Sequence, residues 1–172
     1  MSTDAQQLRK VLQERGGMLA TAESCTGGMI AENMTQIAGA SAWFVGGWVT
    51  YSNEMKTSQL GVDGSLLETH GAVSWQVAKA MCEGAKERSG AIVSISTTGI
   101  AGPSGGSEEK PVGTVFVGCS VANETQVREF RFQGTRDEIR KQVSTTAINM
   151  ATSLVTGDVK EEMCCQYGKT IR

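Results

Sequence analysis

The stretch TAESCTGG, residues 21–28, contains the residues of this sequence that are best placed for chemistry. A short apolar run precedes it and apolar residues at helical spacing follow it, so the chain is predicted to turn from a strand to a helix at Ser24. A hydroxyl at such a turn lies near unpaired backbone N–H groups and the positive end of the helix dipole, which can hold an oxyanion or a phosphate. Gly27 and Gly28 would let a ligand approach the backbone closely. The alternative is an ordinary N-cap, because this position favours serine in any protein.

Ser24 requires a base if it acts as a nucleophile, because an unassisted serine hydroxyl is barely ionised at neutral pH. Lys56, which is expected in the first turn of a short helix after Ser52 or Asn53, is the natural candidate. A lysine base must be neutral, so burial or a neighbouring cation has to lower its pKa. Tyr51 could relay the proton or hold the amine. The alternative for Lys56 is a solvated helix lysine.

Cys25 is a rival nucleophile beside Ser24, but cysteine chemistry usually requires a nearby histidine. His70 is the only histidine of the chain, and its plainer interpretation is a loop or helix-end residue before Gly71. The five cysteines show no CxxC spacing, which argues against a disulfide framework and a zinc site. We therefore expect reduced thiols, no metal and no cofactor.

A glycine-rich loop, residues 97–110, lies between two predicted strands. The fixed φ of Pro103 among glycines suits a backbone cradle for a ligand, and a flexible connector is the alternative. Arg136 and Arg140 lie one turn apart at the start of the last predicted helix and could clamp a phosphate, although most such pairs are merely solvated. The loops at residues 24–28, 51–56 and 97–110 each follow a predicted strand, and ligand sites in open α/β sheets gather at strand ends.

Composition limits the possible functions. The chain has 172 residues, a formal net charge of −2 and a pI near 5.5, with scattered basic residues, so nucleic acid is not an expected partner. No apolar run approaches the roughly 18 residues of a membrane span, and the polar N-terminus does not resemble a signal peptide. We expect a cytoplasmic protein without a membrane partner.

Strands and amphipathic helices interleave along the chain, which favours a single-domain α/β fold with three layers, α/β/α, around a sheet of about five strands. Residues 1–157 form this domain, and the polar tail 158–172 lacks periodicity and is expected to be disordered. A Gly46-Gly47 interruption in one strand indicates a bulge or a close backbone approach. Helices are expected at 4–15, after Ser24, after Ser52 or Asn53, at 74–88 and from Thr135, and strands at 18–20, 43–51, 91–96, 112–121 and 127–132.

Five motifs together resemble a known family: TAESCTGG at 21–28, VTYSNEMK at 49–56, HGAVS at 70–74, TGIAGPSGGSEEKPVGTV at 98–115 and GTRDEIRKQ at 134–142. The family is the CinA C-terminal domain family, whose stand-alone members include bacterial nicotinamide-nucleotide amidases. The resemblance covers residues from about 5 to 155, and larger members carry an additional N-terminal domain with hydrolase activity, to which no stretch of this sequence corresponds.

The resemblance implies a mixed five-stranded sheet and hydrolysis of the carboxamide of nicotinamide mononucleotide to nicotinic acid mononucleotide and ammonia, a step in pyridine nucleotide salvage. It implies Ser24 as nucleophile with Lys56 and Tyr51 as its partners, and a small-molecule nucleotide as the substrate. We also expect a homo-oligomer. The expected substrate-binding residues are Thr26, Gly27, Gly28, Thr98, Gly99, Gly102 and Arg140.

Two other functions remain open from the sequence. A non-catalytic regulatory module could bind a pyridine nucleotide without converting it, because fold resemblance does not determine function. A phosphatase or pyrophosphatase would fit the glycine-rich loops, but the sequence lacks the acidic cluster that usually holds the divalent metal. The products distinguish the three functions, since an amidase releases ammonia, a phosphatase releases phosphate and a binding module releases neither.

Overall fold

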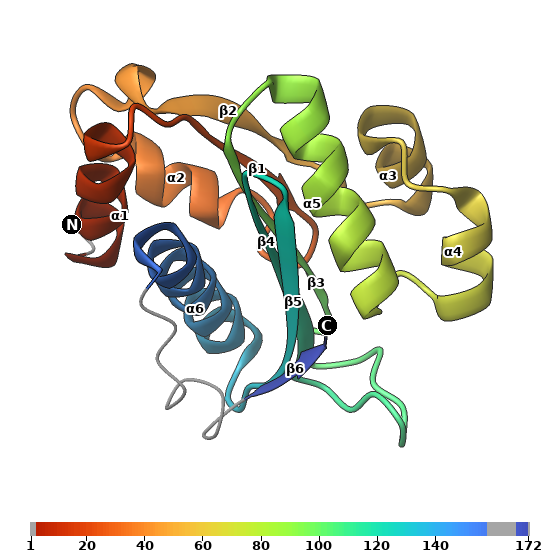
Figure 1. Ribbon diagram of the computed structural model, residues 1–172. Coiled ribbons are helices and arrows are strands. Elements are labelled where there is room, and N and C mark those ends of the chain that lie inside the picture. Colours follow the sequence, from red (N-terminus) through yellow and green to blue (C-terminus); the bar gives the residue numbers. More distant parts are fainter. Residues whose placement is uncertain (1–2, 158–167, 172) are drawn as a thin grey trace.

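A single mixed sheet forms the centre of the protein in the computed structural model, which describes residues 3–157 and 168–171 (Figure 1). The strand order is β2-β1-β3-β4-β5-β6. The strands are β1 (Leu19–Glu23), β2 (Phe44–Val49), β3 (Val93–Gly99), β4 (Thr114–Val121), β5 (Glu124–Arg131) and β6 (Gly168–Ile171). The helices are α1 (Thr3–Glu14), α2 (Met29–Thr35), α3 (Asn53–Leu60), α4 (Gly64–His70), α5 (Trp75–Ser89) and α6 (Arg136–Thr156), with a 3₁₀ turn at Ala40–Ala42.

The directions of the strands bring the predicted site loops together. Strands β2, β1 and β3 run parallel, whereas β4, β5 and β6 are each antiparallel to the preceding strand. The carboxyl ends of β1, β2 and β3 therefore meet at one edge of the sheet, and the three candidate loops begin there. This arrangement confirms the predicted α/β/α fold with a mixed sheet.

Helices cover both faces of the sheet (Figure 1). Helices α1, α2 and α6 pack on one face over the largest apolar cluster, while α5 covers the other face with α3 and α4 beside it. On the α5 face, Ser94 and Ser96 of β3 donate hydrogen bonds of 2.8 and 2.6 Å to the α5 carbonyls of Cys82 and Ala78. Small side chains allow α5 to approach the sheet closely, and these bonds satisfy the buried hydroxyls.

The Gly46-Gly47 interruption in β2 has both expected properties. The register against β1 shifts between Leu19 and Ala20, as expected for a bulge. A Cβ atom at Gly47 would lie only 2.2 Å from the Oγ1 atom of Thr21, so the two strands approach closely at this point. Only glycine fits this position without displacing a neighbouring atom.

The C-terminal tail differs in part from the sequence expectation. Residues 158–167 and 172, which belong to the predicted disordered tail, lie outside the described residues. Residues 168–171, however, form strand β6, which pairs antiparallel with β5 from Val127 to Phe130. Strand β5 is therefore an inner strand of the sheet, with β4 on one side and β6 on the other. The open backbone edge of β5 supplies the pairing partner, and a four-residue strand is too short to show a periodic pattern of its own.

None of the helices between residues 3 and 157 is both long enough and apolar enough to cross a membrane.

A close helix contact positions α3, the helix that carries Lys56. Gly84 of α5 lies against the end of α3, and a Cβ atom there would lie 2.0 Å from the carbonyl oxygen of Leu60. Replacing glycine by alanine inside a helix usually stabilises it by about 0.5 to 1 kcal/mol. At this position the added methyl group collides with a backbone atom that cannot rotate away. The contact between α3 and α5 therefore depends on glycine at position 84.

We expect Gly84→Ala to reduce the free energy of unfolding by about 1 to 3 kcal/mol, because the overpacked helices must move apart. Urea denaturation followed by circular dichroism measures the change. Gly64→Ala is the matched control, since a Cβ atom at Gly64 meets no atom within 4 Å and this variant should keep or gain stability. A Gly84→Ala protein as stable as the wild type would contradict the proposed close contact.

Candidate active site

Ser24 and Lys56 meet at the carboxyl edge of the parallel strands. Ser24 directly follows β1, and its backbone N–H donates to the carbonyl of Thr97 on β3 over 3.0 Å. Lys56 lies in the first turn of α3, which begins after the N-cap Ser52, whose hydroxyl accepts a hydrogen bond from the Met55 N–H. The Lys56 Nζ atom is 3.1 Å from Ser24 Oγ. The structure therefore brings together the predicted nucleophile and its predicted base.

The environment of Lys56 favours a neutral amine. Its side chain is 1% exposed, and Nζ also donates to the carbonyls of Thr50 (2.9 Å) and Tyr51 (3.3 Å). Neither of the ion pairs found among the described residues involves this lysine. Burial lowers the pKa of Lys56, and the weaker influences of Cys25 and Glu54 only partly oppose this shift. A buried lysine with a lowered pKa has the property required of a base.

Tyr51 holds the amine through its backbone and not through its phenol. Its side chain is 59% exposed, and its hydroxyl accepts a hydrogen bond of 2.9 Å from Arg136 Nη2. The atom that contacts Lys56 Nζ is the Tyr51 carbonyl oxygen. Of the two roles considered for Tyr51, holding the amine is therefore the one with a contact in the structure, because the hydroxyl is bonded to Arg136 and not to Lys56 or Ser24.

Cys25 does not have the properties of a nucleophile. Its side chain is only 6% exposed, and burial raises the pKa of the thiol to about 12. The thiolate is the reactive form, so almost none is present near neutral pH. His70 ends α4, where its Nδ1 atom lies 3.2 Å from Nε2 of Gln76. Ser24 is therefore the better nucleophile of the adjacent pair.

The N-terminus of α2 is occupied by the protein itself. The helix begins at Met29 and not at Ser24, and Gly28, with φ of 96°, is its N-cap. The carboxylate of Glu23 accepts hydrogen bonds from the N–H groups of Gly28, Ile30 and Ala31 at 2.9, 3.1 and 2.8 Å. The expectation that this helix end holds a substrate anion is wrong, because these donors are already bound. The sequence pattern does not reveal this role of Glu23, since a carboxylate five residues before an N-cap follows no standard capping pattern.

The two threonines among the expected substrate-binding residues are bonded within the protein. Thr26 Oγ1 donates to Glu23 over 2.7 Å and lies 2.8 Å from Thr97 Oγ1. Thr98 Oγ1 donates to the carbonyl of Ala72 over 2.7 Å. Both side chains are buried. The hydrogen bonds to Glu23 and Ala72 use the donor proton of each hydroxyl, so a substrate could contact these oxygens only as a hydrogen-bond donor.

Arg136 and Arg140 reach the site from α6, which begins after Thr135 as expected and has a capping box formed by Thr135 and Glu138. Arg136 Nη1 donates to the carbonyl of Gly102 over 2.9 Å, so this residue connects the glycine-rich loop to Tyr51. Arg140 Nη2 donates to the carbonyl of Thr26 over 2.7 Å.

The remaining predicted glycines line the same region. Arg140 Nη2 would lie 3.5 Å from a Cβ atom at Gly27. Gly27 and Gly28, with positive φ, belong to the turn after Ser24. Gly99 ends β3, and Gly102, with φ of 78°, lies in the loop that follows. The two arginines therefore contact the backbones of both glycine-bearing loops.

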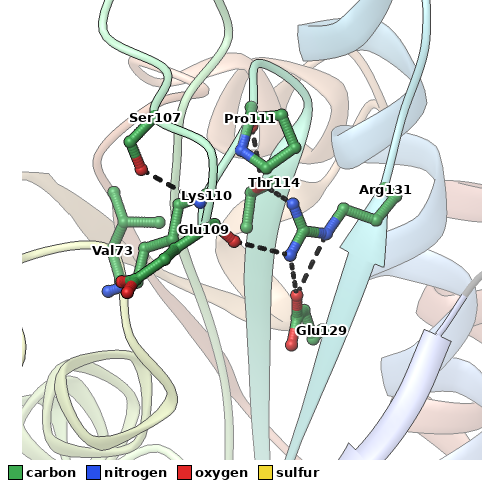
Figure 2. A network of polar contacts seen from close by, with 8 residues as sticks. All are labelled: Val73, Ser107, Glu109, Lys110, Pro111, Thr114, Glu129 and Arg131. Carbon is green, nitrogen blue, oxygen red and sulfur yellow. Dashed lines mark hydrogen bonds and ion pairs between the residues drawn. The ribbon is translucent and has the colours of Figure 1, made fainter.

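The glycine-rich loop is anchored where it returns to the sheet (Figure 2). Lys110 Nζ donates to the carbonyl of Val73 over 2.7 Å, and the Lys110 N–H donates to Ser107 Oγ over 3.0 Å. Arg131 forms a 2.8 Å ion pair with Glu129 and donates hydrogen bonds to Thr114 Oγ1 and the Glu109 carbonyl. These contacts support a shaped loop over a flexible connector.

The arrangement is suited to acyl transfer. A serine hydroxyl lies beside a buried amine, and two guanidinium groups lie near the same loops. Within residues 3–157 and 168–171 there is no group of three or more His, Cys, Asp or Glu side chains that could hold a metal ion. The chemistry available to these side chains is nucleophilic attack by Ser24 assisted by Lys56.

Known proteins share both the sequence and the fold. A family model of the CinA C-terminal domain matches residues 2–155. The CinA-like protein of Acidobacterium capsulatum is 53% identical over 139 residues, which are 81% of this chain and 34% of that protein. The CinA-like protein of Geobacter sp. strain M21 is 51% identical over 146 residues, covering 85% and 35%. The chain thus spans about a third of the length of these relatives.

Solved structures agree with the sequence relatives. The crystal structure of competence/damage inducible protein CihA from Agrobacterium tumefaciens has a TM-score of 0.84 and 42% identity, covering 90% of this chain and 96% of that one. A CinA superfamily protein from Escherichia coli has a TM-score of 0.84 and 32% identity, covering 89% and 88%. The fold, the Ser24 and Lys56 motifs and these similarities lead to one conclusion: the chain belongs to the CinA C-terminal domain family.

Proposed function

We propose that this protein is a nicotinamide-nucleotide amidase, which hydrolyses the carboxamide of nicotinamide mononucleotide to nicotinic acid mononucleotide and ammonia. The observation that carries the proposal is the 3.1 Å contact between Ser24 Oγ and the buried amine of Lys56. The substrate follows from the resemblance of the site motifs to amidases of this family. The surrounding arginines and glycine-rich loop are suited to the phosphate of a mononucleotide.

The chemistry proceeds in two steps. Ser24 Oγ attacks the carboxamide carbon while Lys56 Nζ accepts the hydroxyl proton. The C–N bond then breaks, and Lys56 returns the proton to the departing ammonia, which leaves an ester on Ser24. A water molecule attacks this ester and gives a proton to Lys56, which passes it to Ser24 Oγ as the carboxylic acid is released. The sum is one amide and one water converted to one acid and one ammonia.

The tetrahedral intermediates of this reaction place negative charge on the carboxamide oxygen. Backbone N–H groups that point at that oxygen stabilise it most effectively when they are fixed in advance. Glu23 already binds the amides of Gly28, Ile30 and Ala31, so these donors are not free for the task. We assign the stabilisation of the carboxamide oxygen to the backbone N–H groups of Cys25 and Thr26, which follow the nucleophile in the same turn.

Ser24→Ala should abolish ammonia release while the substrate still binds, because only the covalent step is lost. The assay incubates purified protein with nicotinamide mononucleotide and measures ammonia and phosphate. Cys25→Ala is the matched control and should remain active, since the buried thiol is not ionised. Binding without ammonia in the wild type would indicate a regulatory module, and release of phosphate would indicate a phosphatase. If Ser24→Ala keeps its activity and Cys25→Ala loses it, the nucleophile is Cys25 and not Ser24.

Arg140 is the residue that we expect to contact the substrate phosphate. Charge-assisted contacts of this kind are worth about 1.5 to 3 kcal/mol, so Arg140→Ala should weaken binding of the mononucleotide about ten- to a hundredfold. The variant should then discriminate poorly between the mononucleotide and its dephosphorylated riboside in kcat/KM. Lys141→Ala removes the next cation along α6, which pairs with Asp137, and should keep the wild-type preference. If Arg140→Ala also keeps it, the phosphate binds elsewhere.

The pH dependence should follow Lys56. A base acts only when it is deprotonated, so kcat/KM should rise with pH through the pKa of Lys56 in the free enzyme. Burial lowers this pKa, which places the rise at lower pH than for an exposed lysine. Steady-state rates measured across pH test this expectation. A kcat/KM that is independent of pH below the ordinary lysine range, or that falls as pH increases there, would contradict it.

Lys56→Arg should be nearly inactive at every pH, because a guanidinium cannot deprotonate in a protein. Lys56→Met serves as the second variant, since it removes the amine but fits an apolar environment. Both should lose activity to a similar extent if proton transfer is the function of this side chain. A Lys56→Arg enzyme within about tenfold of the wild type, a barrier difference of about 1.4 kcal/mol, would exclude the general-base role.

A further inference from the structure

Glu23 is the last residue of β1 and directly precedes the nucleophile. Its side chain is fully buried, and its two carboxylate oxygens accept four hydrogen bonds. Oε2 accepts from Thr26 Oγ1, from Gly28 N and from Ile30 N, and Oε1 accepts from Ala31 N at 2.8 Å. One side chain therefore ties the end of the central strand to the turn and to the first residues of α2.

The same turn is held from the neighbouring strand. The Ser24 N–H donates to the Thr97 carbonyl, and the hydroxyls of Thr26 and Thr97 lie 2.8 Å apart. With Glu23, these contacts fix the backbone on both sides of Ser24 Oγ. Arg140 adds a contact from α6 to the Thr26 carbonyl. The direction of the nucleophile is thus determined mainly by hydrogen bonds that converge on Glu23 and Thr26.

Glu23 is also connected to the base through its main chain. Its carbonyl accepts the Thr50 N–H over 2.9 Å, and the Thr50 carbonyl in turn accepts a hydrogen bond from Lys56 Nζ over 2.9 Å. Glu23 therefore contacts both the turn that carries Ser24 and Thr50, whose carbonyl binds the Lys56 amine. A shift at Glu23 would alter the separation of Ser24 Oγ and Lys56 Nζ from both sides.

We infer that Glu23 is a positioning residue for the reaction: its carboxylate holds the turn 24–28 so that Ser24 Oγ faces the Lys56 amine. Its effect on turnover rests on the proposed amidase function. Glutamine preserves the shape of the side chain but replaces one acceptor oxygen by an NH₂ donor. In Glu23→Gln, that NH₂ group must face at least one backbone N–H, so the turn loses a bond and shifts.

Glu23→Gln should lower kcat about 10- to 100-fold with KM within about threefold of the wild type, because a small displacement of reacting groups is costly while the binding groups remain. The rise of kcat/KM with pH should stay in place, since Lys56 remains the base. Thr26→Val removes one donor to the same carboxylate and should show a smaller effect of the same kind. Asp63→Asn is the matched control, an acid-to-amide change at the N-cap of α4, and should keep the wild-type kcat.

A purely structural role would reduce the folded fraction and leave the rate per folded molecule unchanged. Rates are therefore divided by the concentration of folded protein from circular dichroism at a temperature where each variant is folded. A wild-type kcat per folded molecule in Glu23→Gln, or a loss confined to KM, would overturn the inference. A displaced pH profile would also overturn it, because Glu23 would then act on the proton transfer itself.

Two measurements without substrate separate this inference from the proposed function. Amide hydrogen exchange should accelerate at Gly28, Ile30 and Ala31 in Glu23→Gln but not in α5, and a fluorophosphonate should label Ser24 at least tenfold more slowly than in the wild type. Unchanged exchange or unchanged labelling in the variant would reject the positioning role. A wild type that labels at Ser24 but releases no ammonia would reject the amidase function alone. A wild type that does not label would reject both Ser24 as an activated nucleophile and its positioning by Glu23.

Discussion

The site depends on a buried lysine amine that forms no ion pair within residues 3–157 and 168–171. Among the residues that the structure describes, the hydrogen-bond partners of Lys56 Nζ are neutral: Ser24 Oγ and the carbonyls of Thr50 and Tyr51. Removing an ammonium group from water is expensive, and a nearby carboxylate would offset that cost by raising the pKa of the lysine. Neutral acceptors satisfy the donors of the amine without stabilising its charge as strongly. The fold therefore keeps a lysine in a position where protonation is disfavoured.

Keeping this amine buried requires several elements to fit closely. The parallel strands β2, β1 and β3 deliver the segments around Lys56, Ser24 and Thr97 to the same edge of the sheet. Helix α3 is pressed against α5 where Gly84 leaves no room for a side chain, and the bulge in β2 brings Gly47 against Thr21. The hydrophobic cores on both faces of the sheet stabilise this packing. The geometry of the small polar site therefore depends on the burial of many more apolar side chains around it.

The negative charge of Glu23 is bound by hydrogen-bond donors of the protein itself. Glu23 is buried against the amides of α2 and compensates the positive end of that helix. The guanidinium groups of Arg136 and Arg140 connect the turn after Ser24, Tyr51 and the glycine-rich loop, and under the proposed function they also attract the substrate phosphate. Binding and catalytic groups therefore share one hydrogen-bonded framework.

The sequence by itself determined the elements with strong local signals: the α/β alternation, the long helices α5 and α6, the irregularity at Gly46-Gly47 in β2, and the motifs that contain Ser24 and Lys56. Periodicity and capping report contacts within an element, which is why they were sufficient there. Helix α4 has only seven residues, and β6 forms through pairing with a distant strand, so neither left a periodic signal. Only the tertiary structure decided that Tyr51 offers its carbonyl to the amine and that Glu23 occupies the start of α2. The direction of a side chain depends on which distant segments surround it, and residue type and spacing do not contain that information.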